Sequence, residues 1–105
     1  MNEEFKVLLI CGAGMSSGII SKNAKNYAKK NDINMTFEAR SNSEVASFLS
    51  SISLLMIGPH YESSLEKFKT IAEPFGVPVV VIPKKTYARL DGEGIVKLAK
   101  ETLKN

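Results

Sequence analysis

The sequence predicts an α/β fold: a single domain over residues 1–105, built on an open four-stranded parallel sheet with helices on both faces, in the order βαβαβαβα. Two observations predict this fold. Short hydrophobic runs alternate along the chain with segments whose hydrophobic residues recur at helical spacing. The hydrophobic runs are continuous rather than alternating, which indicates strands buried on both faces, as in a parallel sheet covered by helices.

Four hydrophobic runs are predicted to be the strands. They are Phe5–Ile10, Met35–Ala39 in a segment that starts near Ile33, Ser53–Ile57 and Val77–Ile82. In such sheets ligands bind outside the carboxyl ends of the strands, where the strand order reverses. We therefore expect the loop after the first strand, the turn Gly58–Tyr61 and the segment Pro83–Asp91 to share one edge.

The segments between and after the strands are predicted to be helices that bury one face. Their hydrophobic stripes are Ile20, Ala24, Tyr27 and Ala28; Val45, Phe48 and Leu49; Leu65, Phe68, Ala72 and Phe75; and Ile95, Leu98, Ala99, Thr102 and Leu103. Ser41 and Glu44 have the spacing of a capping box for the second helix, which is short and rich in serine. The third is expected to stop around Pro74 and Gly76. Asp91 is expected to cap the last helix, with a role as general acid as the alternative.

Composition indicates a soluble globular protein, since 44% of the residues are hydrophobic and 24% are charged. The one cysteine cannot form an intrachain disulfide, which favours a reducing cytoplasm. The acidic start Met1–Glu4 does not suit a signal peptide. No hydrophobic run approaches the roughly 20 residues that span a bilayer. We therefore expect a cytoplasmic protein without direct membrane insertion.

The formal net charge of +3 comes from lysines spread over three helices. These are Lys22, Lys25 and Lys29; Lys67 and Lys69; and Lys97, Lys100 and Lys104. The distribution is typical of solvated outer faces. Because the chain has no arginine-rich stretch and no interleaved aromatic residues, nucleic acid is not expected as a partner.

Cys11 follows the first predicted strand and opens a loop of small residues that leads into a helix. Unpaired N–H groups and the positive end of the helix dipole make such a junction an anion site. The same field favours thiolate, and can lower a cysteine pKa from about 8.5 to roughly 3.5–7.5. The alternative is a buried structural cysteine. The loop favours the nucleophile, because glycines that allow close backbone approach are not needed around a packed thiol.

The residues after Cys11 are candidates for a phosphate-binding loop whose backbone N–H groups hold the phosphoryl oxygens. They are Gly12, Ala13, Gly14, Met15, Ser16 and Ser17. The first two glycines allow unusual backbone angles and close approach of the anion, whereas Gly18 is expected to relieve packing at the helix start. The two serine hydroxyls either donate to phosphate or cap the helix.

Two further residues are expected at the same edge. His60 is interpreted as part of a partner-facing surface or a cap for the next helix, with catalysis as the alternative. Tyr87 is either an aromatic lid that packs on the last strand or a hydroxyl that contacts the phosphoryl group.

The segments Cys11–Ser17, Gly58-Pro59 and Tyr87–Gly92 resemble the enzyme IIB component of the lactose/cellobiose class of the bacterial sugar phosphotransferase system (PTS), from about residue 5 to about residue 103. The resemblance implies a phosphotransferase whose cysteine, here Cys11, takes a phosphoryl group from a phosphohistidine of enzyme IIA. The group then passes to a sugar bound by the membrane enzyme IIC. A β-linked disaccharide is expected, with cellobiose, chitobiose and lactose all open, and no cofactor or metal is implied. His60 departs from the family pattern, which commonly has glutamine after Gly-Pro.

Low-molecular-weight tyrosine phosphatases share the strand-loop-helix arrangement but need an arginine six residues after the cysteine. Ser17 stands there in this chain. Without a bidentate guanidinium or a carboxylate in the loop, hydrolysis of a phosphocysteine is expected to be slow, as a carrier requires. A phosphatase-like hydrolase and a non-catalytic anion-binding regulatory module stay as alternative functions.

Overall fold

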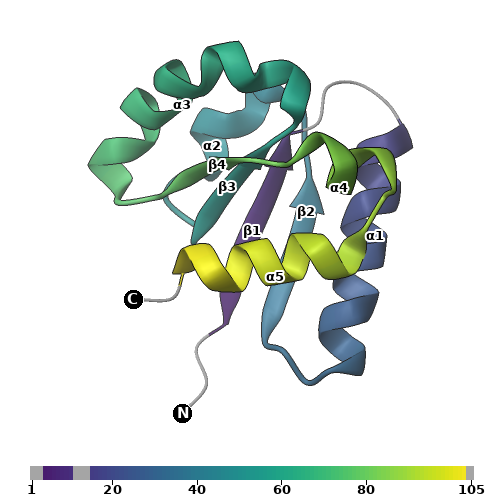
Figure 1. The fold of residues 1–105 in the computed structure, drawn as a ribbon. Helices are drawn as coiled ribbons and strands as arrows, with labels where there is room; N and C mark the ends of the chain where they lie inside the picture. The colour runs from purple at the N-terminus through teal and green to yellow at the C-terminus, as the bar shows by residue number, and fades with distance from the viewer. Residues whose placement is uncertain (1–3, 11–14, 104–105) are drawn as a thin grey trace.

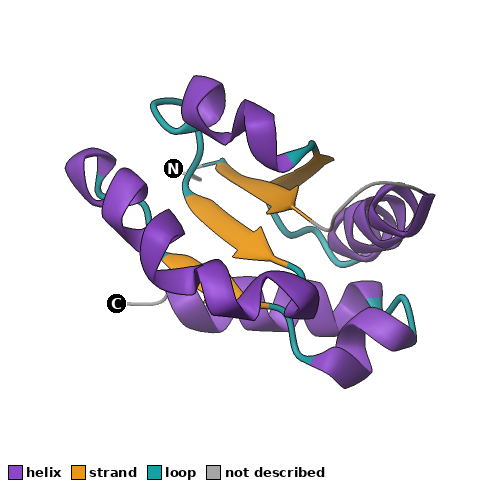
Figure 2. Cartoon of the chain, turned by 90° about the horizontal axis from the view of Figure 1, so that it is seen from above, coloured by secondary structure: helices purple, strands orange, loops and turns teal. Residues whose placement is uncertain are grey.

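The computed structural model describes residues 4–10 and 15–103, with residues 15–17 described by their backbone alone. Within these residues, four parallel strands form one sheet in the order β2-β1-β3-β4 (Figure 1). Viewed from above, helices lie on both faces of this sheet (Figure 2). The predicted fold class is confirmed.

The strands are short and close to their predicted bounds. They are β1 (Phe5–Ile10), β2 (Met35–Ala39), β3 (Leu54–Ile57) and β4 (Val79–Val81). The last two are shorter than expected. Before β4, Pro78 has no N–H to donate, and its carbonyl instead accepts the N–H of Leu55 at 3.0 Å. After β4, the N–H of Ile82 donates to the carbonyl of Ile57 at 2.8 Å.

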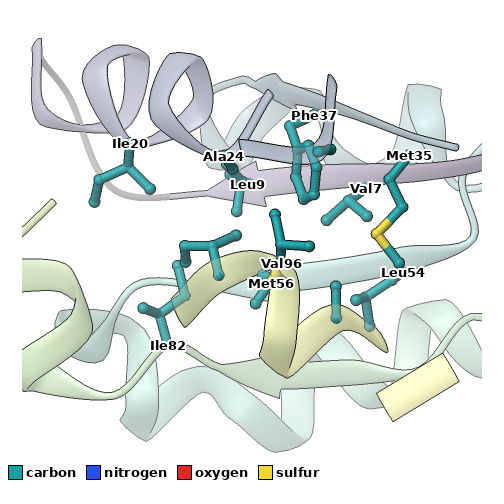
Figure 3. Packing of buried hydrophobic residues seen from close by; sticks show 13 residues of the cluster. Val7, Leu9, Ile20, Ala24, Met35, Phe37, Leu54, Met56, Ile82 and Val96 are labelled. Carbon is teal, nitrogen blue, oxygen red and sulfur yellow. The ribbon is translucent and has the colours of Figure 1, made fainter. Parts of the chain in front are cut away.

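One face of the sheet is covered by α1 (Met15–Lys30) and α5 (Gly92–Leu103). Ile20 and Ala24 of α1 pack with Val96 of α5 over Leu9 and Met56 of the central strands (Figure 3). The one buried polar residue among the described positions, Ser21, donates its hydroxyl to the carbonyl of Phe37 at 3.2 Å. The hydrophobic stripes predicted for these two helices therefore form one core.

The other face is covered by two shorter assemblies. The first joins the 3₁₀ helix η1 (Asn42–Glu44) to α2 (Val45–Phe48), and the second joins η2 (Pro59–Ser64), α3 (Leu65–Ala72) and η3 (Glu73–Phe75). Their buried residues include Val45, Phe68 and Ala72, and Leu49, which follows α2, is buried with them. Together with the helices on the opposite face, they cover β1 and β3 on both sides. Residues Val7–Ile10 and Leu54–Ile57 of these strands are all buried.

Two predictions on this face are wrong. Ser41 makes no side-chain capping bond: its hydroxyl lies 3.0 Å from that of Ser43, and Glu44 pairs instead with Arg40 at 3.6 Å. Phe75 is 50% exposed rather than buried. The chain leaves the α-helical spiral at Glu73, so a residue at the expected helical spacing no longer points to the core.

An additional short helix, α4 (Lys84–Ala88), lies between β4 and α5, in a segment that the sequence pattern left as a connection. The strand order reverses between the two central strands. From β1 the chain moves outward through α1 to β2, and from β3 it moves outward through α3, on the opposite face, to β4. The carboxyl ends of β1 and β3 thus frame the position where ligands bind in such sheets, at the upper end of the sheet in Figure 1.

Candidate functional site

The junction between β1 and α1 lies at this edge. β1 ends at Ile10 and α1 begins at Met15, and the first turn of this 16-residue helix contains no acidic residue. The positive end of the α1 dipole therefore faces the carboxyl end of the sheet without a carboxylate in its first turn to neutralise it. Such a helix start is suited to an anion or to a thiolate.

The predicted reactive loop lies at this junction in the sequence. Cys11, Gly12, Ala13 and Gly14 lie outside the described residues, as do the side chains of Met15, Ser16 and Ser17. Their roles in binding phosphate therefore stay predictions. Gly18 is described, and the expectation that it relieves packing is wrong for the described part of the chain, where a Cβ at this position would have no atom within 4 Å beyond its chain neighbours and the backbone of its own helix.

The turn after β3 is held against the end of β1. The buried Gly58 donates its N–H to the carbonyl of Ile10, the residue before Cys11, at 2.7 Å. Pro59 then opens η2, and the N–H of Tyr61 returns to the carbonyl of Gly58 at 2.9 Å. These bonds fix the backbone of the intervening His60 at the point where the strand order reverses.

His60 and Tyr87, both predicted at the edge, are brought together there. The exposed His60 ring lies 4.8 Å from the ring of Tyr61 and 5.6 Å from that of Tyr87, between ring centroids. Tyr61 meets the buried Phe68 edge-on at 6.1 Å, which ties this cluster to the core. The N-caps of η2 and α3 have no side-chain hydrogen bond, so His60 does not cap the next helix.

Three features fix the connection from α4 to α5. Leu90 adopts a left-handed conformation, with φ of 52°, and its carbonyl accepts a hydrogen bond from the Asn23 side chain at 2.8 Å. Asp91 accepts the N–H of Gly94 at 3.0 Å through its carboxylate, which confirms its predicted role as a cap. At Gly92 a Cβ would lie 2.3 Å from the backbone carbon of Asn23, so only glycine fits.

Asn23 is the anchor that sequence reasoning missed. It holds the α4–α5 connection against α1 both by its side-chain hydrogen bond and by its backbone contact with Gly92. A polar residue within a helix gives no periodic signal. Asn23 directly precedes Ala24, a predicted core position, and this is the only feature of the sequence which indicates that Asn23 borders the buried face.

The two sides of the edge differ in charge. Next to β4, the cations Lys84, Lys85 and Arg89 are exposed, and none of them forms an ion pair within the described residues. Next to β2, Arg40 pairs with both Glu38 and Glu44, which leaves a negative excess. The α4 side of the edge therefore favours anions more than the α2 side does.

The lysines predicted to lie on solvated faces of the helices are exposed wherever they are described. They are Lys22, Lys25, Lys29, Lys67, Lys69, Lys97 and Lys100, whereas Lys104 lies outside the described residues. Among residues 4–10 and 15–103, no three histidine, cysteine or acidic side chains are grouped so that they could hold a metal ion. None of the helices in these segments is long and apolar enough to cross a membrane.

This arrangement defines the chain as a doubly wound α/β protein whose strand order reverses between β1 and β3, the position where such sheets bind ligands. Comparison with known families shows which family of such proteins the chain belongs to. The family model described as "PTS system, Lactose/Cellobiose specific IIB subunit" matches residues 6–98, and the chain belongs to this family. The resemblance to the lactose/cellobiose IIB component that was seen in the sequence is therefore confirmed.

Individual relatives agree with this assignment. The chain is 24% identical over 95 residues to the "PTS system lactose-specific EIICB component" of Lacticaseibacillus casei, a match that covers 90% of this chain but 16% of that longer protein. The solved cellobiose-specific IIB component of Borrelia burgdorferi is 27% identical, with a TM-score of 0.79 over 96% of this chain and 93% of that one. The lactose-specific IIB domain of Streptococcus pneumoniae, 18% identical, shares the fold with a TM-score of 0.85 over 94% and 97% of the two chains.

Proposed function

We propose that this chain is a phosphocysteine carrier of the sugar phosphotransferase system. Cys11 accepts a phosphoryl group from a phosphohistidine of enzyme IIA and passes it to a sugar bound by the membrane enzyme IIC. The observation that supports this proposal is the position of the only cysteine, between the end of β1 and the start of α1 in a chain of the IIB family. The carrier acts as a single domain in the cytoplasm.

Both transfers are substitutions at phosphorus. In the first, the Cys11 thiolate forms the S–P bond while the P–N bond to the donor imidazole breaks, and the released nitrogen keeps the electron pair. In the second, a sugar hydroxyl attacks phosphorus, the S–P bond breaks, the thiolate leaves, and the hydroxyl proton passes to solvent or to a base of the acceptor. The α1 dipole stabilises the thiolate that each step consumes or releases.

The loop from Gly12 to Ser17 supplies positioning and charge stabilisation through its backbone N–H groups, with the serine hydroxyls as further donors. Because Ser17 stands where a phosphatase has its arginine, the bound phosphoryl group lacks a guanidinium that would promote hydrolysis. The phosphocysteine therefore persists long enough to reach the acceptor.

The acceptor is proposed from the names of the family and its relatives. The family is described as lactose/cellobiose specific, and the Lacticaseibacillus casei relative is named as a joint IIC and IIB component. We therefore assign to this chain a membrane IIC partner and a β-linked disaccharide substrate, whose contacts lie in the partner rather than in this chain.

Intact-mass analysis tests the carrier. Incubation with the general phosphotransferase proteins and a matching enzyme IIA should add one phosphoryl group to the wild-type protein and none to Cys11→Ser. His60→Gln serves as the matched control and should still be labelled, because the label is expected on sulfur. Equal uptake by Cys11→Ser, or label found on His60, would contradict the proposal.

Two assays distinguish the alternative functions. Rapid turnover of para-nitrophenyl phosphate that needs Cys11 but not enzyme IIA would indicate a phosphatase-like hydrolase. Phosphate binding that survives Cys11→Ala in a protein that enzyme IIA never labels would indicate an anion-binding regulatory module. A carrier shows neither result.

A further inference from the structure

The positive charge of the chain is concentrated on α1 and around α4. α1 carries four lysines and the segment 84–89 adds three cations, and neither contains an acidic residue. The seven are Lys22, Lys25, Lys29, Lys30, Lys84, Lys85 and Arg89. The other seven cations of the chain stand against all eleven acidic residues, so the formal net charge of +3 divides into +7 on these two segments and −4 elsewhere. The protein is therefore strongly polarised in charge.

The outer surface of α1, opposite the buried Ile20 and Ala24, is one stripe of exposed residues at helical spacing. Its members are Ile19, Lys22, Asn26, Lys29 and Lys30. Ile19 is 43% exposed, which makes it one of the few large hydrophobic side chains on the surface of the described residues. The stripe thus combines positive charge with an aliphatic side chain.

The end of α4 continues this surface beside α1 (Figure 1). The Asn23 side chain donates to the carbonyl of Leu90 at 2.8 Å, and Lys30 and Arg89 both line a cavity of about 620 Å³ between the two segments. The N–H of Arg89 donates to the carbonyl of Lys85 at 3.1 Å, so the two side chains lie one turn apart on the same side of α4. We call Lys22, Lys29, Lys30, Lys85 and Arg89 the basic face.

Neighbouring carboxylates do not neutralise the basic face. None of its five cations forms an ion pair within the described residues. Two acidic residues line the same cavity, but both are engaged elsewhere. Glu93 pairs with Lys97 at 2.7 Å, and the carboxylate of Asp91 accepts the N–H of Gly94 at 3.0 Å. The like charges repel one another, and a negatively charged surface would relieve this repulsion.

We infer that the basic face binds an anionic membrane surface, as a peripheral contact in which no helix crosses the bilayer. Its charges extend along much of α1, a helix about 24 Å long, which is more than a small anion spans. Four of the five are lysines, whose compact charge suits a diffuse layer of headgroups better than bidentate recognition of one group. Ile19 can enter the headgroup region. In the proposed carrier, whose acceptor lies in the membrane, this contact raises the local concentration of carrier at the acceptor.

Vesicle flotation tests this without any phosphotransferase partner. At about 0.1 M salt the protein should float with phosphatidylcholine vesicles that contain about one third phosphatidylglycerol, but not with phosphatidylcholine alone, and about 1 M salt should release it. Each lysine near an anionic surface contributes about fivefold in partitioning, so Lys22→Gln/Lys29→Gln should bind about 25-fold more weakly. Lys67→Gln/Lys69→Gln is the matched control. It removes the same charge from exposed positions of α3, on the other face of the sheet, and should bind within about twofold of the wild type.

A wild-type protein that does not float with the anionic vesicles overturns the inference. Equal losses in the two double variants overturn it as well, because net charge rather than the basic face then decides binding. If vesicles are not bound but Lys22→Gln/Lys29→Gln slows phosphoryl uptake from enzyme IIA, the occupant is an acidic protein and the membrane is excluded. The carrier proposal is tested separately, because labelling of the protein by enzyme IIA is measured in solution without vesicles.

Discussion

Gly92→Ala tests the contact between α1 and α5, on which the position of α4 depends. A Cβ at residue 92 would lie 2.3 and 2.4 Å from the carbonyl carbon and oxygen of Asn23, and 2.6 Å from the nitrogen of Ala24. All three are backbone atoms, so no side chain can rotate away. Because non-bonded carbon atoms are most favourable at about 3.5–4.0 Å, α5 has to move from α1 by about 1 Å.

The expected cost has two parts. Overpacking of a close contact costs about 1–3 kcal/mol, and the displaced hydrogen bond from Asn23 to Leu90 contributes about 1 kcal/mol more. We therefore expect a loss of about 2–4 kcal/mol in the free energy of unfolding, measured by urea denaturation. Since about 1 kcal/mol corresponds to roughly 4–8 °C in a domain of this size, Tm should fall by at least about 8 °C.

Gly18→Ala is the matched control, since it makes the same change in a helix where, among the described residues outside that helix's own backbone, a Cβ meets nothing within 4 Å. Alanine is the better helix former there by about 1 kcal/mol, so this variant should be equally or more stable than the wild type. A Gly92→Ala protein that unfolds within about 0.5 kcal/mol of the wild type would refute the reasoning, because that is the range of an uninvolved surface position.

Two further predictions concern α5. Asp91→Ala removes the carboxylate that accepts the Gly94 N–H, and it should cost about 0.5–2 kcal/mol in urea denaturation, whereas Asp91→Asn should restore most of this. Glu93 lies 2.7 Å from Lys97, and this hydrogen bond, together with the carboxylate charge, raises the Lys97 pKa above its ordinary 10.5. The stabilisation is present below pH 10.5 and is lost as the pH rises through the higher folded-state pKa, so the Tm difference between wild type and Glu93→Gln should shrink above about pH 10.5. In Glu93→Gln, NMR titration should give a Lys97 pKa closer to its ordinary value. An unchanged Lys97 titration would contradict the role assigned to Glu93.

The layered core could be predicted because its signal is local and repeated. Continuous hydrophobic runs such as Val7–Ile10 are fully buried, as the pattern requires of a central parallel strand. Phe75 shows where such reasoning fails. Its spacing from Phe68 and Ala72 is helical, but the change to a 3₁₀ turn at Glu73 depends on Pro74 and Gly76 and turns the ring toward solvent. A prediction from helical periodicity holds only as long as the α-helix continues.

The position of the candidate site could also be predicted, because carboxyl ends of parallel strands meet at one edge. Which side chains become neighbours at that edge could not be predicted. α4 is a five-residue helix, too short for hydrophobic periodicity to reveal. The pairing of His60 with Tyr87 depends on how α4 packs, and the role of Asn23 depends on how closely α5 approaches α1. Both are tertiary contacts between residues distant in sequence.

The segment Tyr87–Gly92, one of the three that carry the family resemblance, divides by role in the structure. Leu90 turns the chain in a left-handed conformation that costs a leucine about 1–2 kcal/mol, offset in part by the Asn23 hydrogen bond to its carbonyl and by partial burial of its side chain against the core. Asp91 starts α5, and Gly92 lets it lie against α1. These three residues form the connection between α4 and α5, whereas Tyr87, one turn earlier, is the residue that contacts the His60 ring. A sequence motif in this family can therefore mark the scaffold that places a site as well as the site itself, and substitutions at Leu90–Gly92 should affect transfer only to the extent that they displace α4.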